Sequence, residues 1–157
     1  MKTLLTSEQA AALAFAGGEY VAPEAIPDAT LAAVQERYVK PVTGEALLGA
    51  LLEGSYEELR DTYVVPAAAA WLRVMLLPRM NLQTGGCGLA AVARQGWQAA
   101  GGTTVTEALK QARAEARTLL ARLSDHLEQH AARYPEYRPA DNILNRCRIH
   151  GDLVQIR

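Results

Sequence analysis

The residue types best suited to chemistry are sparse in this sequence, which has three histidines and two cysteines. His126 and His130 are four residues apart in a stretch with helical periodicity, so both imidazoles could reach one metal ion. The helical zinc-protease motif, however, places a glutamate directly after the first histidine, and here Leu127 occupies that position. Two histidines also leave a zinc site short of ligands. We therefore predict no metal site and interpret the pair as polar residues near a helix end.

A cysteine thiol is the second candidate for chemistry. Cys147 and His150 are three residues apart, and Cys87 lies in the glycine-rich segment Gly85–Gly88. Nucleophilic catalysis needs a base and usually an orienting third group beside the thiolate, and the sequence does not bring such a set together. A thiol enzyme stays an alternative. The favoured interpretation is that the cysteines are small residues that fill a tight turn or the core.

The glycines of residues 85–88 do not match a nucleotide-binding motif. A phosphate-binding loop needs a lysine followed by serine or threonine, and the dinucleotide fingerprint needs a preceding strand and a crossover unit. Neither is present here. We therefore predict no catalytic residue and no cofactor, and we expect the protein not to be an enzyme.

The composition predicts a helical domain around these residues. The 157 residues suit one domain with a real core, half of them are hydrophobic, and alanine predominates over aromatic residues, with a single phenylalanine. A formal charge of −1 lacks the broad basic surface of a dedicated nucleic-acid binder. We find no apolar run of transmembrane length, no apolar run long enough for a signal peptide and no disulfide pattern, so we expect a cytoplasmic protein without membrane contact.

The apolar periodicity predicts helices over residues 6–15, 27–40, 43–52, 56–77 and 105–133. Thr6–Gln9 and Ser55–Glu58 have the spacing of capping boxes, which predicts helix starts there, and Leu13 belongs to the apolar pattern of the first helix. Pro41 is expected to end the second helix, and Pro66 to kink the fourth. Ala67–Leu77 is almost entirely apolar, which indicates the buried central helix. Trp71 is expected in the core, where Trp71→Ala would cost about 3–5 kcal/mol. The fold class predicted is all-α, a helical bundle with a long C-terminal amphipathic helix.

Two segments interrupt this pattern. Residues 81–102 favour a small β-hairpin or an extended loop, and residues 140–157 form an extended C-terminal arm on a helical domain of residues 1–139, within the same domain unit. Both carry apolar residues that regular helices cannot bury, and such surfaces usually meet another chain. The predicted interface residues are Leu82, Leu89, Val92, Trp97, Ile143, Arg146, Arg148 and Ile156. Deleting the residues after Pro139 is expected to leave a folded domain that no longer assembles.

The order of the elements is similar to that of a known family. Short helices up to Leu52 precede the buried helix Tyr56–Leu77, which carries the run Pro66–Trp71; the break at Leu82–Val92 and a long amphipathic helix follow. This arrangement resembles the small helical head–tail connector (adaptor) proteins of tailed bacteriophages and prophages over residues 1–135.

The resemblance implies a structural protein that joins the portal of the capsid to the tail. Such a protein would assemble as a ring, bind portal and tail proteins, and let DNA pass along its channel. It would lie in the bacterial cytoplasm during assembly and afterwards in the virion. A non-enzymatic helical regulatory or adaptor module that binds another protein is the alternative.

Overall fold

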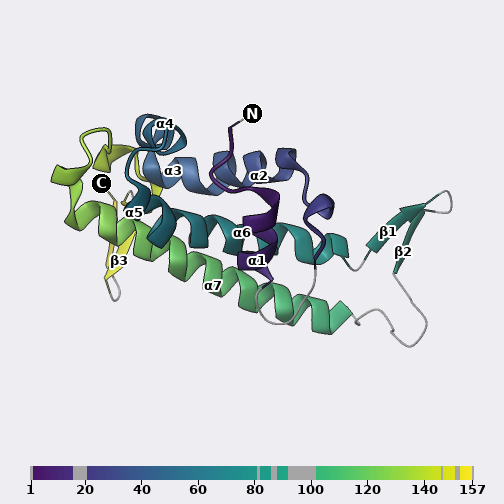
Figure 1. Cartoon of the computed structure of the whole chain (residues 1–157). Helices are drawn as coiled ribbons and strands as arrows, with labels where there is room; N and C mark the ends of the chain where they lie inside the picture. The colour runs from purple at the N-terminus through teal and green to yellow at the C-terminus, as the bar shows by residue number, and fades with distance from the viewer. Residues whose placement is uncertain are drawn as a thin grey trace.

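The computed structural model describes residues 2–15, 21–80, 82–85, 88–91, 102–145, 147–150 and 153–156, with the strands described by their backbone alone. The fold is all-α, as predicted, and is built on two long helices, α6 (Val65–Met80) and α7 (Gly102–Gln129), which pack side by side in opposite directions (Figure 1). Shorter helices cover one side of this pair. Each helix in the described residues is too short or too polar to span a bilayer.

The shorter elements follow one another closely along the chain. The helices are α1 (Ser7–Ala14), α2 (Asp28–Val34), α3 (Lys40–Thr43), α4 (Glu45–Leu52) and α5 (Glu57–Leu59). The π-helical turns are η2 (Gln35–Val39) and η3 (Arg60–Val64), and the 3-10 turns are η1 (Pro23–Ala25), η4 (Ala131–Arg133), η5 (Pro139–Asp141) and η6 (Ile143–Asn145). The strands form two antiparallel pairs, β1 (Leu82–Gly85) with β2 (Gly88–Ala91) and β3 (Cys147–His150) with β4 (Leu153–Ile156).

The start of α1 follows the predicted capping chemistry. The Thr6 hydroxyl accepts a hydrogen bond from the Gln9 backbone N–H, and the Gln9 side-chain oxygen accepts one from the Thr6 N–H, both at 3.2 Å. This reciprocal pair satisfies two N–H groups that no helical carbonyl can reach.

Pro41 and Pro66 each lie within a helical run just after a π turn, and Pro78 lies within α6, which continues to Met80. The prediction that Pro41 ends the second helix is wrong, because the helical run from Asp28 continues through η2 to Thr43. Lys40 donates its backbone N–H to the carbonyl of Gln35, five residues earlier, and Val65 donates in the same way to Arg60 before Pro66. The wider turn shifts the hydrogen-bond register by one residue directly before each proline, which lacks an N–H and crowds the preceding turn. A π turn therefore lets both helices continue through a proline.

The beginning of α5 differs from the predicted capping box at residues 55–58. Tyr56 precedes the helix in the left-handed region, with φ of 57°, and the helix start has no side-chain cap. The Tyr56 hydroxyl donates to Glu136 at 2.8 Å, and its ring meets the Tyr134 ring edge-on with centroids 5.2 Å apart. Contacts with the C-terminal segment thus accompany a conformation that local sequence alone would not favour.

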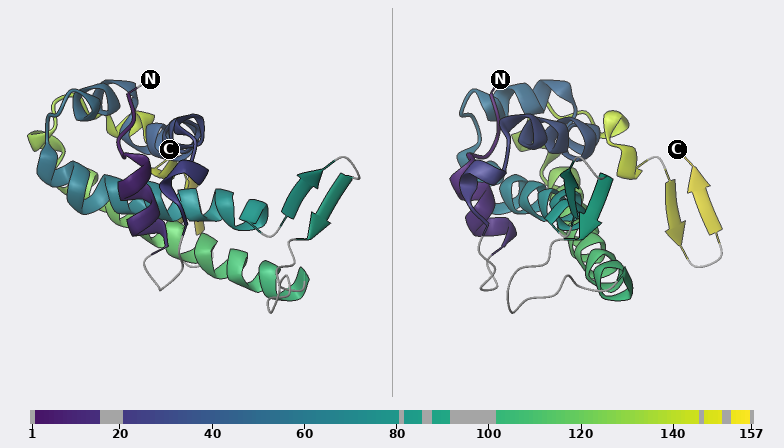
Figure 2. Two further views of the ribbon diagram at one scale, coloured as in Figure 1. Left: turned by 45° about the vertical axis from the view of Figure 1, so that its right-hand side comes forward. Right: turned by 90° about the vertical axis from the view of Figure 1, so that its right-hand side faces the viewer.

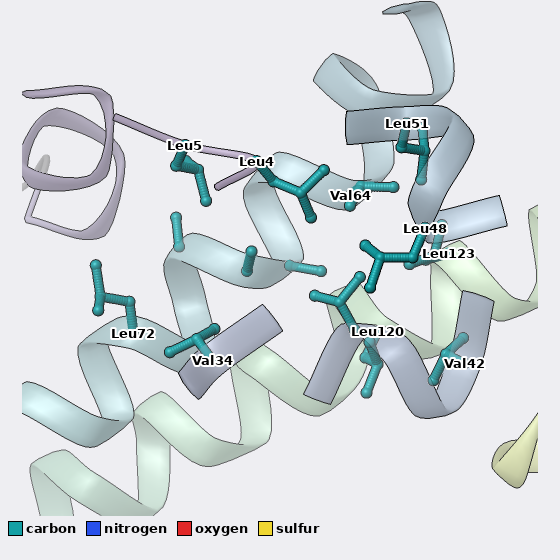
Figure 3. Close-up of a cluster of buried hydrophobic side chains, with 14 of the residues drawn as sticks. Leu4, Leu5, Val34, Val42, Leu48, Leu51, Val64, Leu72, Leu120 and Leu123 are labelled. Atoms are coloured by element: carbon teal, nitrogen blue, oxygen red, sulfur yellow. The ribbon is translucent and has the colours of Figure 1, made fainter. Parts of the chain in front are cut away.

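The core lies where small residues let the helices approach. Ala67, Ala68, Ala69 and Leu72 of α6 are buried, as predicted for this segment. Leu120, Leu123 and Leu127 of α7 share this cluster, while Ala112 and Ala116 of α7 are buried with Val74 in a second, smaller one. Figure 3 shows how leucines and valines of the shorter helices and the N-terminal segment close this core from above, among them Leu4, Val42, Leu48, Leu51 and Val64.

Trp71 differs from the expectation that it lies fully inside this core. It is only partly buried and stacks on Tyr38, with ring centroids 4.0 Å apart and ring planes 8° from parallel. The alanines around it bring α6 so close to its neighbours that a tryptophan fits only at the margin. Leucine side chains fill the centre instead.

The first residues of the predicted C-terminal arm are packed against the helical domain. Turns η5 and η6 contact α3, and Asn142 is fully buried. Residues 140–145 therefore belong to the packed helical domain, because the side chains of Asn142 and Asn145 form hydrogen bonds with α7.

Substitution of a central leucine tests the position of the core. Leu72→Ala is expected to lower the free energy of unfolding by about 3 kcal/mol, since it leaves a cavity at a site with no exposure. Leu13→Ala, at a side chain that is 49% exposed, serves as the matched control and should cost less than about 1 kcal/mol. Urea denaturation measures both; equal losses would show that the core is misplaced.

Two truncations test where the folded unit ends. Ending the chain after Pro139 removes Asn142, so the buried Ser124 hydroxyl loses that partner and the Tyr137 hydroxyl keeps only its bond to Glu128; the melting temperature should fall by about 5 °C or more. Ending it after Asn145 keeps these bonds and should leave the thermal transition nearly unchanged. If both truncated chains melt like the full chain, residues 140–145 are not part of the folded unit.

Candidate assembly surface

A buried polar network fixes the turn η6 on helix α7. Asn142 donates through its side-chain nitrogen to the Ser124 hydroxyl at 2.8 Å and to the Tyr137 hydroxyl at 2.9 Å. Its side-chain oxygen accepts from the Leu144 backbone N–H at 3.0 Å. A buried asparagine with donors and acceptor engaged leaves little freedom to the turn that carries it.

Glu128 extends this network along α7. Its carboxylate accepts from the Tyr137 hydroxyl at 2.7 Å and from the side-chain nitrogen of Asn145. Burial raises the pKa of Tyr137 to about 12, so this phenol stays protonated and keeps donating at any ordinary pH.

The rigid turn presents two aliphatic side chains to solvent. Ile143 is 52% exposed and Leu144 is 38% exposed, although Asn142 and Asn145 on either side are buried. Large exposed aliphatic residues on an ordered turn cost free energy that contact with a partner would recover. We call Ile143 and Leu144 the aliphatic knob.

A groove lies on another face, between α1, α6 and α7. It has a volume of about 330 Å³ and is lined by small and aliphatic residues together with one cation and one carboxylate. Leu13, Pro66, Ala70 and Leu119 are among its apolar walls, and Glu115 lies at its edge on α7. The sequence pattern had assigned Leu13 to the buried stripe of α1, whereas half of its surface is exposed beside this groove.

Histidines 126 and 130 form a stack rather than a pair converging on one point. The His126 ring stacks on Tyr63 with centroids 4.1 Å apart and on His130 with centroids 4.4 Å apart. Its Nε2 lies 3.0 Å from the Tyr134 hydroxyl, and Nδ1 of His130 lies 3.0 Å from the backbone oxygen of His126. In the part of the chain that the structure describes, no three His, Cys, Asp or Glu residues come together as a metal-binding group.

The predicted interface residues are distributed over several elements. Ile143 is exposed, as its assignment requires. Leu82, Leu89, Arg148 and Ile156 lie one each on β1, β2, β3 and β4. Val92, Trp97 and Arg146 lie outside the described residues, as does Cys87. Cys147 and His150 are the first and last residues of β3.

Sequence reasoning missed two parts of the surface. Leu144 and Leu13 are exposed, yet each reads as an ordinary core residue in an apolar pattern. A signal for Leu144 was present in the alternation Asn142, Ile143, Leu144, Asn145, where polar residues flank two aliphatic ones. For Leu13 no such signal exists, because α1 is apolar on most of its circumference.

Comparison with known proteins gives one match. Residues 23–146 match the model of DUF6712, a family of unknown function. No curated protein and no solved structure matches the chain significantly.

The histidine stack predicts a dependence of stability on pH. Burial lowers the pKa of His126 below its ordinary value of 6.5, with His130 and Arg133 acting in the same direction and Glu58 against it. The unfolded chain therefore binds more protons just below pH 6.5, so stability is full above that pH and is lost as the pH falls toward the lowered pKa.

Thermal melts between pH 7.5 and 5.5 measure this effect. The wild-type melting temperature should fall by a few degrees, and His126→Phe, which keeps a ring in the stack, should flatten the slope. Gln129→Ala, an exposed neighbour, should keep the wild-type slope. An unchanged slope in His126→Phe would assign the pH dependence to other groups.

Proposed function

The chain belongs to the DUF6712 family, and we propose that it is a structural protein of tailed bacteriophages or prophages. In this role it joins the portal of the capsid to the tail as a head–tail connector. It acts by ring assembly and protein–protein contacts, without catalysis. It functions in the bacterial cytoplasm during assembly and then in the virion.

The observation that carries this proposal is the presence of exposed aliphatic side chains on two sides of one body. The aliphatic knob lies on the C-terminal turns, and Leu13 lies on α1. Figure 2 (right) places α1 and the yellow-green C-terminal turns on opposite sides of the helical body. Two different contact surfaces on opposite sides favour head-to-tail association, which closes into a ring when the rotation between copies allows it.

The order of elements supports the same role. The strands β1 and β2, which lie between α6 and α7 in the chain, project beyond the end of this helical pair (Figure 1), and the element order is the one on which the resemblance to connectors over residues 1–135 rests. The near-zero formal charge of −1 suits a ring that lets DNA pass without holding it.

Self-association is the direct test of this function. Sedimentation velocity of the full chain over a wide concentration range should show conversion of the monomer to one closed species of defined mass. Electron micrographs of that species should show annular particles. A portal protein from the same phage or prophage should shift the conversion to lower concentration, because a binding partner stabilises the assembled form by mass action.

The contrary result is equally specific. A chain that stays monomeric at every concentration and binds neither a portal nor a tail protein would not be a connector. Stoichiometric binding of such a monomer to a different protein would instead support the regulatory module.

A further inference from the structure

We propose that the aliphatic knob of one copy docks into the groove between α1, α6 and α7 of the next copy. The inference rests on the proposed ring and names the two surfaces that would form its repeating contact. The partner is thus a second copy of this chain.

The knob is preorganised for such a contact. Ile143 and Leu144 are held by the hydrogen bonds of Asn142 to Ser124 and Tyr137 on the protein side. Little conformational entropy is lost when an ordered turn binds, so the buried aliphatic area contributes more of its free energy to association.

The groove has the size and lining that an aliphatic pair requires. Its volume of about 330 Å³ is more than twice the roughly 150 Å³ of a cavity that accepts benzene. Ala69 and Ala70 line it with short side chains, and Leu13, also part of the lining, adds exposed apolar surface. Two branched aliphatic side chains would remove both this lining and themselves from water.

Charges beside the two surfaces are complementary. Glu115 lies at the groove, and Arg138 directly precedes the turns that carry the knob. Both are exposed, and neither has a salt bridge with another described residue. Asp141 and Arg73 offer a second pair of opposite charges, although Arg73 already donates to the Ala14 carbonyl and lies over the Phe15 ring.

The arrangement excludes pairing within one chain. The C-terminal turns that carry the knob and the helix α1 that borders the groove lie on opposite sides of the helical body (Figure 2, right), so the knob does not reach the groove of its own copy. The knob of each copy therefore binds the groove of another copy. An open assembly has one unoccupied groove and one unoccupied knob at its ends, and these two meet when the assembly closes into a ring.

Disulfide trapping tests the contact directly. Leu13→Cys and Ile143→Cys are combined in a chain that also carries Cys87→Ser and Cys147→Ser. Oxidation at a concentration where the chain self-associates should give a ladder of disulfide-linked multimers on a denaturing gel. Replacing Ile143→Cys by Ala140→Cys, an exposed position on the adjacent turn, should weaken the ladder strongly.

A charge exchange tests the same contact without cysteines. Glu115→Arg and Arg138→Glu should each raise the concentration for half-assembly by about tenfold, and the double variant should recover most of the loss. Asp125→Lys, an exposed acidic residue elsewhere on α7, is the matched control and should assemble normally. Thermal melts of each variant verify folding, since all three substituted positions are exposed.

The outcomes separate this contact from the proposed function. If rings form normally but no disulfide-linked multimers appear and the charge variants assemble like the wild type, the proposed contact is wrong. The connector role would then still stand. The opposite outcome is also defined. If the disulfide ladder forms and the double charge variant recovers assembly, the contact is established; if the assemblies are open filaments that bind no portal protein, the connector role is overturned.

Discussion

The close approach of α6 and α7 is the constraint on which the other elements depend. Alanines at 67–69 on one helix and at 112 and 116 on the other remove the side-chain bulk that would hold the axes apart. Such packing gains many weak dispersion contacts per residue but leaves no room for large side chains, which explains why Trp71 lies at the margin. The shorter helices α1, α2 and α3 pack onto the platform that this pair creates.

A different kind of interaction defines the C-terminal end of the body. Asn142 is wholly enclosed and bonded to Ser124, Tyr137 and the backbone of its own turn. Buried polar groups add little net stability when satisfied but cost much when broken, so they select one arrangement over others. The same network that closes the chain onto α7 fixes the orientation of two exposed aliphatic residues, and fold and surface are therefore coupled there.

Sequence periodicity was sufficient for the helical class, for the capped start of α1 and for the buried stretch around Ala67–Leu72. It failed where distant contacts or backbone geometry override local preference. Pro41 reads as a helix end because a π turn has no distinct sequence signal, and Tyr56 takes a left-handed conformation beside Glu136 and Tyr134, some 80 residues away. Among the surface residues, Ile143 was accessible to sequence reasoning, whereas Leu13 was not, because one face of a short apolar helix cannot be distinguished from another without its neighbours.

The π turns before Pro41 and Pro66 also set the rotation of one helical segment against the next. An α-helix turns by about 100° per residue, so one added residue changes which side chains face the core in everything that follows. In the run Glu57–Met80, the turn Arg60–Val64 therefore changes which side chains of α6 face α7 relative to the start of the run, beside Tyr56 and its contacts with Glu136 and Tyr134. A single-residue insertion or deletion at these turns would act as an angular adjustment rather than a break, and the chain could reorient one contact surface while leaving the other unchanged.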